Sequence, residues 1–243
     1  MQDTLVIIPT YNEKENIENM VKAVFSLEKS FDILVVDDNS PDGTAEIVKK
    51  LQTAYPNRLF LEIRKNKNGL GTAYIHGFKW ALSKKYNYII EMDADFSHNP
   101  KDLIRLYRAC NDYGADVSIG SRYSKGVNVV NWPMNRVLMS YFASKYVRFI
   151  TRIPIHDTTA GFVCYKREVL ETINFDRIKF IGYAFQIEMK FRAYLKKYKI
   201  EEVSIIFRDR VKGKSKMSSS IISEAIFGVM KMKLKSIFQK NKF

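Results

Sequence analysis

Short aliphatic runs alternate along the first half of the chain with stretches in which hydrophobic residues recur every three or four positions. The runs predict buried strands, and the helical spacing predicts amphipathic helices. The predicted strands are 5–8, 31–36, 59–63, 88–92 and 117–120, and the predicted helices are 13–27, 44–55, 71–83 and 100–113. Apolar strands that alternate with helices indicate an α/β fold with a mostly parallel sheet covered on both faces.

Polar residues gather where three of the predicted strands end. Pro9-Thr10-Tyr11 follows the first strand, Asp37-Asp38 the second and Asp93-Ala94-Asp95 the fourth. Because parallel sheets bind ligands at the carboxyl ends of their strands, we expect the three clusters to form one site. Two carboxylates so placed suit a hard divalent cation whose remaining ligands are water and substrate phosphates. Taken alone, so short a motif is more simply explained as a polar strand end.

Two common phosphate-binding motifs are missing from the sequence. No G-x-G-x-x-G sequence follows the first predicted strand, and no G-x-x-x-x-G-K-[ST] loop is present. The nearest approach is Asn68-Gly69-Leu70-Gly71, whose glycines we interpret as a tight turn into a helix. Ordinary dinucleotide binding and P-loop chemistry therefore lose support.

The composition describes a globular chain with a strong positive charge. Its 243 residues, 46% of them hydrophobic, suffice for one large or two small domains with a proper core. The net charge of +14 indicates polyanionic partners, which include nucleic acid, an anionic membrane surface and phosphorylated substrates. Cys110 and Cys164 lack metal-site or disulfide-framework spacing, so we interpret them as packing residues of a protein from a reducing compartment.

Two signs of membrane targeting are missing from the sequence. The N-terminus does not resemble a signal peptide, and no run of eighteen apolar residues occurs. Two segments, 129–153 and 221–243, interleave apolar and basic residues and predict basic amphipathic helices that could lie in a membrane interface. For 129–153, an ordinary helix packed on the core explains the pattern equally well. For the tail, 218–243, we favour an interfacial element.

Many motifs that occur in a fixed order and spacing identify a protein family, whereas any one of them alone does not. The chain resembles the family-two glycosyltransferases of GT-A fold, and within them the dolichyl or polyprenyl phosphate mannosyltransferases. The resemblance covers almost the whole chain, and the residues that carry it are Pro9-Thr10-Tyr11-Asn12-Glu13, 36–44, 69–74, 92–98, 120–123, Asn131-Trp132-Pro133 with Arg136, 157–162, 182–188, Asp209-Arg210 and Gly213-Lys214-Ser215-Lys216.

The resemblance implies a role for individual residues. The nucleotide of GDP-mannose would be bound by Pro9, Tyr11, Glu13, Val36 and Asp38. The metal, Mg²⁺ or Mn²⁺, would be held by Asp93, Asp95 and Ser97, with a backbone contact from Ala94. The diphosphate or sugar would be bound by Arg122, Arg210 and Lys216, and the acceptor phosphate by Arg122 and Arg136. Asp95, Arg122, Arg136 and Arg210 form the predicted catalytic set. His98, beside the metal motif, we interpret as a polar loop residue.

The implied reaction is inverting, metal-dependent transfer of mannose to a dolichyl or polyprenyl phosphate. A phosphate monoester with a second pKa of about 6 is already ionised at neutral pH, so the acceptor needs no general base. The implied architecture is a Rossmann-like, three-layer GT-A catalytic domain over 1–217, including 129–153, plus a C-terminal amphipathic tail over 218–243. We expect a peripheral enzyme on the cytoplasmic face of a membrane. A small membrane-anchoring subunit would be compatible with this location.

Two alternatives stay open at this point. One keeps the fold and the metal but uses a UDP-sugar to transfer glucose or an N-acetylhexosamine; Val163, which stands where relatives often carry a basic residue, leaves room for a different donor or acceptor. The other is a basic nucleic-acid-binding protein, suggested by the charge and the many aromatic residues. The sequence lacks a nucleic-acid motif and its aromatics lie in periodic apolar runs, so we expect no nucleic-acid partner.

Overall fold

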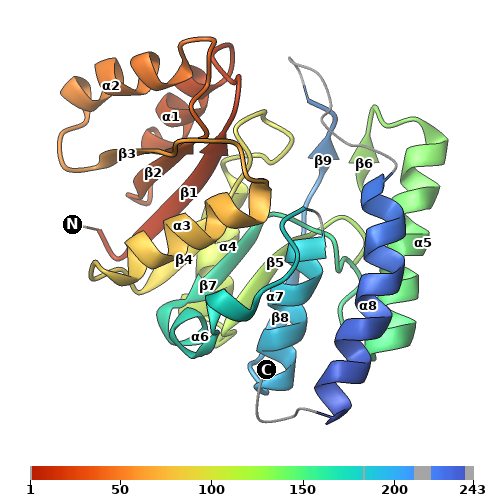
Figure 1. The fold of residues 1–243 in the computed structure, drawn as a ribbon. Helices are drawn as coiled ribbons and strands as arrows, with labels where there is room; N and C mark the ends of the chain where they lie inside the picture. Colours follow the sequence, from red (N-terminus) through yellow and green to blue (C-terminus); the bar gives the residue numbers. More distant parts are fainter. Residues whose placement is uncertain (1, 183, 211–219, 239–243) are drawn as a thin grey trace.

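The computed structural model describes residues 2–182, 184–210 and 220–238, with backbone only for 220–226 (Figure 1). A seven-stranded sheet lies at its centre, with the strand order β3-β2-β1-β4-β7-β5-β8. Its strands are β1 (Thr4–Thr10), β2 (Asp32–Asp37), β3 (Leu59–Ile63), β4 (Tyr88–Glu91), β5 (Val117–Ser121), β7 (Val163–Lys166) and β8 (Ile200–Ser204). Adjacent strands are parallel except where β7 pairs antiparallel with β4 and β5. A separate parallel pair joins β6 (Val129–Val130) to β9 (Phe207–Arg208).

Helices cover both faces of this sheet. They are α1 (Ile17–Phe25), α2 (Thr44–Ala54), α3 (Leu70–Leu82), α4 (Asp102–Asn111), α5 (Met134–Thr151), α6 (Arg167–Thr172), α7 (Ala184–Leu195) and α8 (Ser220–Phe238), with a 3₁₀ turn at Phe175–Arg177. Successive residues of β1 point to opposite faces, so Leu5 and Ile7 join the core under α3 and α7, while Val6 and Ile8 join the core under α1 and α4. The predicted three-layer fold with a mostly parallel sheet is confirmed.

The first half of the chain matches the predicted elements closely, because its continuous aliphatic strands and amphipathic helices are strong signals. Segment 129–153 is different, since its first residues form β6 and the helix begins only at Met134. Asn131 has a φ of 64°, and the backbone of Pro133, with ψ 142°, is extended. Both conformations stop a helix from starting earlier. The prediction of one helix over the whole segment is therefore wrong at its N-terminal end.

Helices α5 and α8 lie side by side at the edge of the molecule that is farthest from α1 and α2 (Figure 1). A small apolar cluster joins them to α7 through Val147, Ile187, Phe191, Val229 and Met232. Within the described ranges, no helix combines the length and the apolar character that crossing a bilayer requires.

The two cysteines are packing residues, as predicted. Cys110 on α4 and Cys164 on β7 are both buried and not joined by a disulfide. The Cys110 Sγ lies 3.8 Å from the carbonyl oxygen of Cys164, which places both in the core beneath α4.

Replacing Gly71 by Ala is expected to lower the free energy of unfolding by about 1–2 kcal/mol. A Cβ at Gly71 would lie 2.7 Å from Cγ of the buried Phe185, where α3 meets α7. Overpacking of this kind costs about 1–3 kcal/mol, and the helix propensity of Ala returns up to about 1 kcal/mol of it. Denaturant unfolding measures the difference. Gly161→Ala is the control, because its Cβ would lie 3.8 Å from the nearest atom, Nε2 of Gln186; equal losses in both variants would contradict this packing.

Candidate active site

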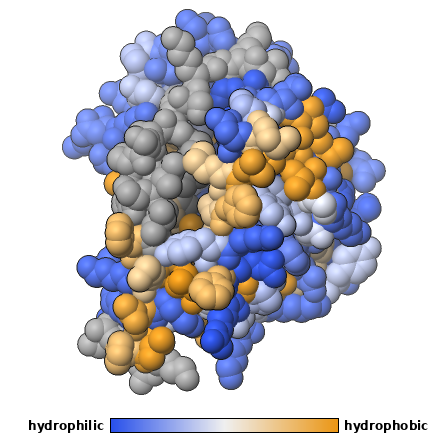
Figure 2. All heavy atoms as spheres, turned by 90° about the vertical axis from the view of Figure 1, so that its right-hand side faces the viewer, coloured by the Kyte–Doolittle hydropathy of each residue, from blue (hydrophilic) through white to orange (hydrophobic). Residues whose placement is uncertain are grey.

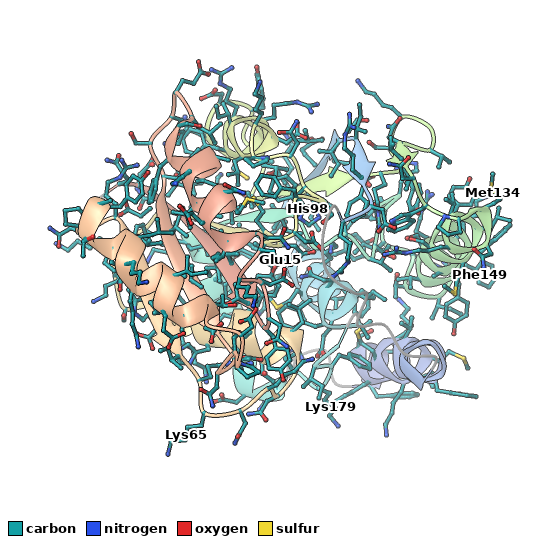
Figure 3. The ribbon with its side chains drawn as sticks, turned by 90° about the horizontal axis from the view of Figure 1, so that it is seen from above. Glu15, Lys65, His98, Met134, Phe149 and Lys179 are labelled. Carbon is teal, nitrogen blue, oxygen red and sulfur yellow. The ribbon has the colours of Figure 1, made fainter. Side chains whose placement is uncertain are left out.

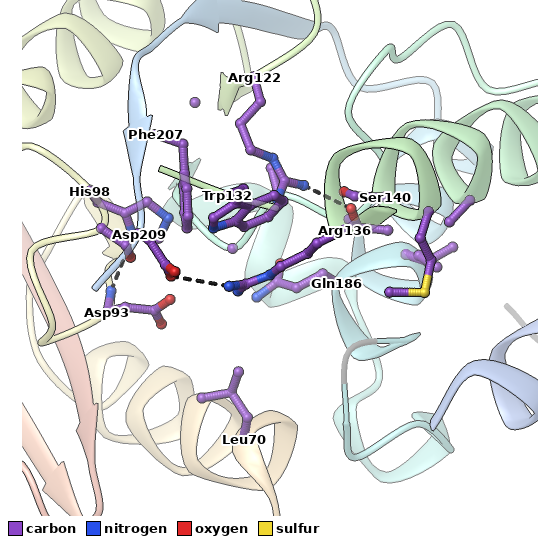
Figure 4. A pocket seen from close by; sticks show the side chains of 18 of the residues that line it. Leu70, Asp93, His98, Arg122, Trp132, Arg136, Ser140, Gln186, Phe207 and Asp209 are labelled. Atoms are coloured by element: carbon purple, nitrogen blue, oxygen red, sulfur yellow. Dashed lines mark hydrogen bonds and ion pairs between the residues drawn. The ribbon is translucent and has the colours of Figure 1, made fainter. Parts of the chain in front are cut away.

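A cavity of about 490 Å³ lies at the carboxyl ends of β4 and β5, between the sheet and the α5 and α7 helices (Figure 4). It brings together six residues that the sequence predicted, namely Asp93, Asp95, Ser97, Arg122, Arg136 and Arg210. These come from loops that follow β4, β5 and β9 and from the first turn of α5. Of the three polar clusters that we expected to form one site, only the one after β4 lines this cavity, whereas the residues after β1 and β2 do not.

The D-x-D loop forms one end of the cavity. The Asp95 side chain is buried, and its Oδ1 accepts a hydrogen bond of 3.1 Å from the backbone N–H of Ser97. Asp93 Oδ1 lies 3.5 Å from the Tyr74 hydroxyl. Burial, together with the nearby Asp95 carboxylate, raises the pKa of Asp93 to about 7. A cation between the two carboxylates would relieve that repulsion.

The donor atoms at this end fit a hard divalent cation. Asp93, Asp95 and Ser97 line the same cavity, and the buried Ser97 Oγ has no hydrogen-bond partner among the described residues. Oxygen donors of this kind suit Mg²⁺ or Mn²⁺. Over the part of the chain that the structure covers, no group of three or more His, Cys, Asp or Glu side chains is placed to hold a metal. The protein therefore offers two carboxylates, and substrate oxygens would have to complete a metal shell.

His98 is a buried wall of the cavity, which corrects its interpretation as a polar loop residue (Figures 3 and 4). Its ring stacks on Phe162 at 4.7 Å between centroids, and its Nδ1 accepts a hydrogen bond of 3.3 Å from the Asp93 backbone N–H. Burial lowers the pKa of His98 to about 4. A neutral imidazole thus holds the backbone of the D-x-D loop in place.

Arg122 is fixed by a buried carboxylate that the sequence did not identify as a site residue. Asp157 is fully buried, and its carboxylate accepts hydrogen bonds from Arg122 Nε at 2.7 Å and Nη2 at 2.6 Å. It also accepts one of 2.9 Å from the backbone N–H of Arg122. Nη2 donates further to Thr159 Oγ1 at 2.8 Å. The guanidinium is therefore held in one orientation at the cavity wall.

Replacing Asp157 by Asn is expected to lower the free energy of unfolding by about 3–5 kcal/mol, because it leaves the Arg122 charge buried without its partner. Burial alone would raise the pKa of Asp157, but the charge and hydrogen bonds of Arg122 hold it below its usual value. A carboxyl group with a depressed folded pKa stabilises the fold above its unfolded pKa of about 3.9, and this contribution is lost as the pH falls through the folded pKa. Unfolding measured against pH should therefore show the largest difference at neutral pH and a smaller one below about pH 4. A constant difference would contradict the ion pair.

Arg136 and Arg210 belong to two further ion pairs across the cavity. Arg136 Nη1 lies 3.0 Å from Asp209 Oδ1 (Figure 4). Arg210 Nη2 lies 3.2 Å from Asp95 Oδ2. The Arg136 guanidinium also stacks on the Trp132 ring at 4.0 Å from its centroid. The residues predicted for acceptor phosphate and for diphosphate thus face one space.

The residues predicted to bind the nucleotide lie on a neighbouring part of the sheet edge. Pro9 and Val36 are opposite one another in the β1–β2 register, and the Val36 side chain is buried in the core. Ala94 is likewise buried in the core on the other face. Because the side chains of Val36 and Ala94 are buried, only their backbone atoms could contact a ligand. Tyr11 and Glu13, in the loop after β1, are partly exposed, so their side chains could contact it.

Two loops are tied together beneath these residues. The backbone N–H of Asn12 donates to Ser40 Oγ at 3.0 Å, and that of Glu13 donates to Thr44 Oγ1 at 3.0 Å. Lys67, from the loop before α3, lies over the Tyr11 ring at 4.3 Å from its centroid. The loops after β1, β2 and β3 therefore form one surface.

Asp38 has a partner that sequence reasoning missed. Both carboxylate oxygens of Asp38 accept hydrogen bonds from Arg64, at 2.6 Å from Nε and 2.7 Å from Nη2. Arg64 Nη1 also donates to Thr72 Oγ1 at 2.7 Å. In so basic a chain most arginines are expected to be solvated surface residues, and nothing in the sequence distinguishes Arg64 from the other basic residues. Lys216, the remaining predicted residue, lies outside the described residues.

A buried polar cluster lies beside the cavity, and only one of its residues, Gln186, belongs to a motif noted in the sequence. Gln186 Nε2 donates to Glu91 Oε2 at 2.7 Å, directly before the D-x-D loop. Lys190 Nζ donates to the Ala160 carbonyl at 2.6 Å. Burial raises the pKa of Glu91 and lowers that of Lys190, while the charge of each opposes the shift of the other. The cluster connects the strand that precedes the D-x-D loop to the loop that carries Asp157.

A family model described as Glycosyl transferase family 2 matches residues 5–173, which include the whole D-x-D loop and the Arg122–Asp157 pair. The chain belongs to this family. It is therefore a glycosyltransferase, and its mostly parallel sheet covered by helices is the GT-A-like fold of such enzymes.

Curated relatives within the family are similar over nearly the whole chain. Polyprenol monophosphomannose synthase of Mycolicibacterium smegmatis is 48% identical over 228 residues, covering 94% of this chain and 86% of that protein. Undecaprenyl-phosphate mannosyltransferase of Micrococcus luteus is 42% identical over 225 residues, covering 93% and 91%. The chain is thus similar to polyprenyl phosphate mannosyltransferases, as its motifs predicted.

A solved structure supports the fold. The mannosyltransferase PcManGT from Pyrobaculum calidifontis, in complex with GDP-Man and Mn²⁺, aligns with a TM-score of 0.58 at 18% identity. The alignment covers 88% of this chain and 58% of that one. At this level of identity the likeness concerns the arrangement of the sheet and its helices.

Proposed function

We propose that this glycosyltransferase transfers mannose from GDP-mannose to a polyprenyl or dolichyl phosphate, with inversion and with Mg²⁺ or Mn²⁺. The observation that supports this most is the lining of the cavity, which combines the Asp93 and Asp95 carboxylates and three arginines with an apolar arm of side chains from α5 and α7. The curated relatives named for polyprenol and undecaprenyl phosphate support the acceptor. The solved neighbour with GDP-Man and Mn²⁺ supports the donor and the metal.

The apolar arm fits the lipid of such an acceptor. It runs between α5 and α7 and is lined by Met139, Phe142, Ala143, Tyr146, Val147 and Ile187. Phe142 is 58% exposed, so the arm is open at the molecular surface. A polyprenyl chain could leave along it while its phosphate stays beside Arg122 and Arg136. A soluble acceptor would not need this arm.

The reaction proposed at this site is a single in-line displacement. An oxygen of the acceptor phosphate attacks the anomeric carbon, the bond from that carbon to the diphosphate breaks, and GDP leaves with the electron pair, which inverts the configuration. Arg122 and Arg136 would orient the acceptor through charge-assisted hydrogen bonds. Arg210 would stabilise the charge that develops on the diphosphate. A bound divalent cation, held by Asp93 and Asp95 with Ser97 nearby, would neutralise that charge further.

The nucleotide is proposed to lie on the surface formed by the loops after β1, β2 and β3. Tyr11 offers a ring, Glu13 and Asp38 offer carboxylates, and Pro9, Val36 and Ala94 offer backbone contacts. Lys216 is proposed as a further ligand of the diphosphate. Since Arg64 already holds both oxygens of Asp38, it would fix how that carboxylate faces a guanine.

Nucleotide binding tests the donor. Calorimetric titration of the protein with GDP and with UDP, each in the presence of Mn²⁺, should show preferential binding of GDP. Binding of UDP in preference to GDP would overturn the proposed donor and favour a UDP-sugar, leaving the fold unaffected.

We further propose that the outer face of α5 and α8 contacts a membrane peripherally, on the cytoplasmic side, with residues 218–243 as an interfacial tail of the catalytic domain over 1–217. Figure 2 shows hydrophobic patches among hydrophilic side chains on this side of the molecule. Met134 and Phe149 point outward from α5 (Figure 3), and Phe227 and Phe238 on α8 are 73% and 82% exposed. The cations Lys145, Arg148, Lys231 and Lys235 lie on the same two helices. Apolar and basic side chains together suit an anionic interface, with or without an anchoring subunit.

Replacing Phe149 by Ser is expected to weaken binding to vesicles of anionic phospholipid about tenfold. Phe149 is 82% exposed, and burying such a side chain contributes about 1.5–3 kcal/mol. Co-sedimentation with vesicles measures the effect. Tyr113→Ser, at a 72% exposed aromatic after α4, is the control and should bind like the unaltered protein. Equal binding by both variants would argue against this face.

A further inference from the structure

The three arginines of the cavity are paired with carboxylates in unequal ways. Asp157 is fully buried and takes three hydrogen bonds from Arg122, so this pair is part of the scaffold. The Asp209 side chain is 32% exposed and meets Arg136 through one contact of 3.0 Å. Single contacts between partly exposed groups exchange far more readily than a buried bidentate pair. Asp209 is therefore placed to give up Arg136 to a competing anion.

Asp209 is also connected to both walls of the cavity. Its backbone N–H donates to the Val130 carbonyl at 3.0 Å, which ties it to β6 and the start of α5. The preceding Arg208 donates its N–H to the Ser97 carbonyl at 3.3 Å, which ties β9 to the D-x-D loop. A shift of the D-x-D loop can thus reach Asp209 through the hydrogen bond between Ser97 and Arg208, the residue before Asp209.

The neighbouring Arg210 makes that connection direct. Asp209 Oδ1 accepts hydrogen bonds from Arg136 Nη1 and from the backbone N–H of Arg210, both at 3.0 Å. The side chain of Arg210 in turn reaches Asp95 Oδ2 at 3.2 Å. The Asp209 carboxylate, which pairs with Arg136, is thus oriented by the backbone of Arg210. The side chain of the same Arg210 pairs with Asp95 of the D-x-D loop.

We propose that Asp209 is a positioning residue that competes with the acceptor phosphate for Arg136 and releases it when the donor diphosphate draws Arg210 away from Asp95. The inference rests on the proposed function and deepens it. A diphosphate beside Asp95 offers Arg210 a stronger partner, and a turn of the Arg210 peptide removes the hydrogen bond that aims Asp209 at Arg136. Acceptor phosphate then binds Arg136 without displacing a fixed carboxylate. Donor and acceptor binding are coupled, and by linkage the coupling is reciprocal.

Equilibrium dialysis with ³²P-labelled farnesyl phosphate tests the coupling. The unaltered protein is expected to bind this probe about tenfold more tightly when Mn²⁺ and GDP are present, a coupling of ordinary size. In Asp209→Asn, the probe should bind about tenfold more tightly than to the unaltered protein without Mn²⁺ and GDP, and adding them should change its affinity less than about twofold. Removing a negative charge alone could tighten binding of an anion, so the loss of donor dependence is the decisive readout.

Asp176→Asn is the matched control. It removes one carboxylate that pairs with Lys79 of α3 at 2.8 Å and does not line the cavity, and it should keep the full donor dependence. A donor dependence that is the same in Asp209→Asn as in the unaltered protein, or absent from both, would overturn the inference while leaving the proposed function standing. Failure of farnesyl phosphate to bind any of the three proteins would overturn both.

Discussion

Replacing Asp95 by Ala is expected to reduce the rate of mannosyl transfer about 100- to 1,000-fold, because losing a group that stabilises transition-state charge has an effect of this size. Asp95 is buried at the end of the cavity, where its two oxygens contact the Ser97 N–H and the Arg210 guanidinium. Its loss removes one of two carboxylates for the cation and leaves Arg210 without that contact. Initial rates at saturating GDP-mannose and Mn²⁺ measure the effect.

A metal-binding readout separates this role from a fold defect. Electron paramagnetic resonance of Mn²⁺ in the presence of GDP should show weakened metal binding in Asp95→Ala and unchanged binding in Asp176→Ala, whose carboxylate is 82% exposed. Full transfer activity in Asp95→Ala would remove the D-x-D loop from the mechanism.

Replacing Arg136 by Ala is expected to lower kcat/KM for the lipid phosphate about 10- to 150-fold, because a hydrogen bond to a charged group contributes about 1.5–3 kcal/mol. The Arg136 guanidinium stacks on Trp132, and Arg136 lines the cavity together with the D-x-D carboxylates and the apolar arm. The binding of GDP with Mn²⁺ should not be weakened, since no contact joins Arg136 to the described residues proposed for the nucleotide. Steady-state kinetics with varied acceptor, beside GDP calorimetry, measure both quantities.

Arg105→Ala provides the control for loss of an arginine. Arg105 lies on α4, is paired with Asp102 at 2.6 Å and is half exposed, so its variant should keep the acceptor kinetics of the unaltered protein. If Arg136→Ala impaired GDP binding as strongly as acceptor use, Arg136 would belong to the donor side.

The strand ends show what a sequence can predict about this fold. Continuous aliphatic strands and periodic helices identify the parallel half of the sheet. Of the three polar strand ends expected to meet, the one after β4 lines the cavity and those after β1 and β2 do not. β7 escaped prediction because it has four residues and pairs antiparallel between two strands from the first half of the chain. Its place depends on tertiary packing, which periodicity does not contain.

The charge partners within the site show what a sequence cannot predict. Motif order indicated Arg122, Arg136 and Arg210, but nothing in it paired them with Asp157, Asp209 and Asp95, because those contacts join segments far apart along the chain. His98 was misjudged for a related reason. Its neighbours in sequence are polar, and only the fold brings the Phe162 ring against it.

The most direct test of the account is transfer of radiolabelled mannose from GDP-mannose to a polyprenyl phosphate in detergent, with and without Mg²⁺ or Mn²⁺ and beside UDP-glucose and a UDP-N-acetylhexosamine. Label is expected in the lipid fraction from GDP-mannose alone, and only when a divalent cation is present. Label from a UDP-sugar and none from GDP-mannose would contradict it.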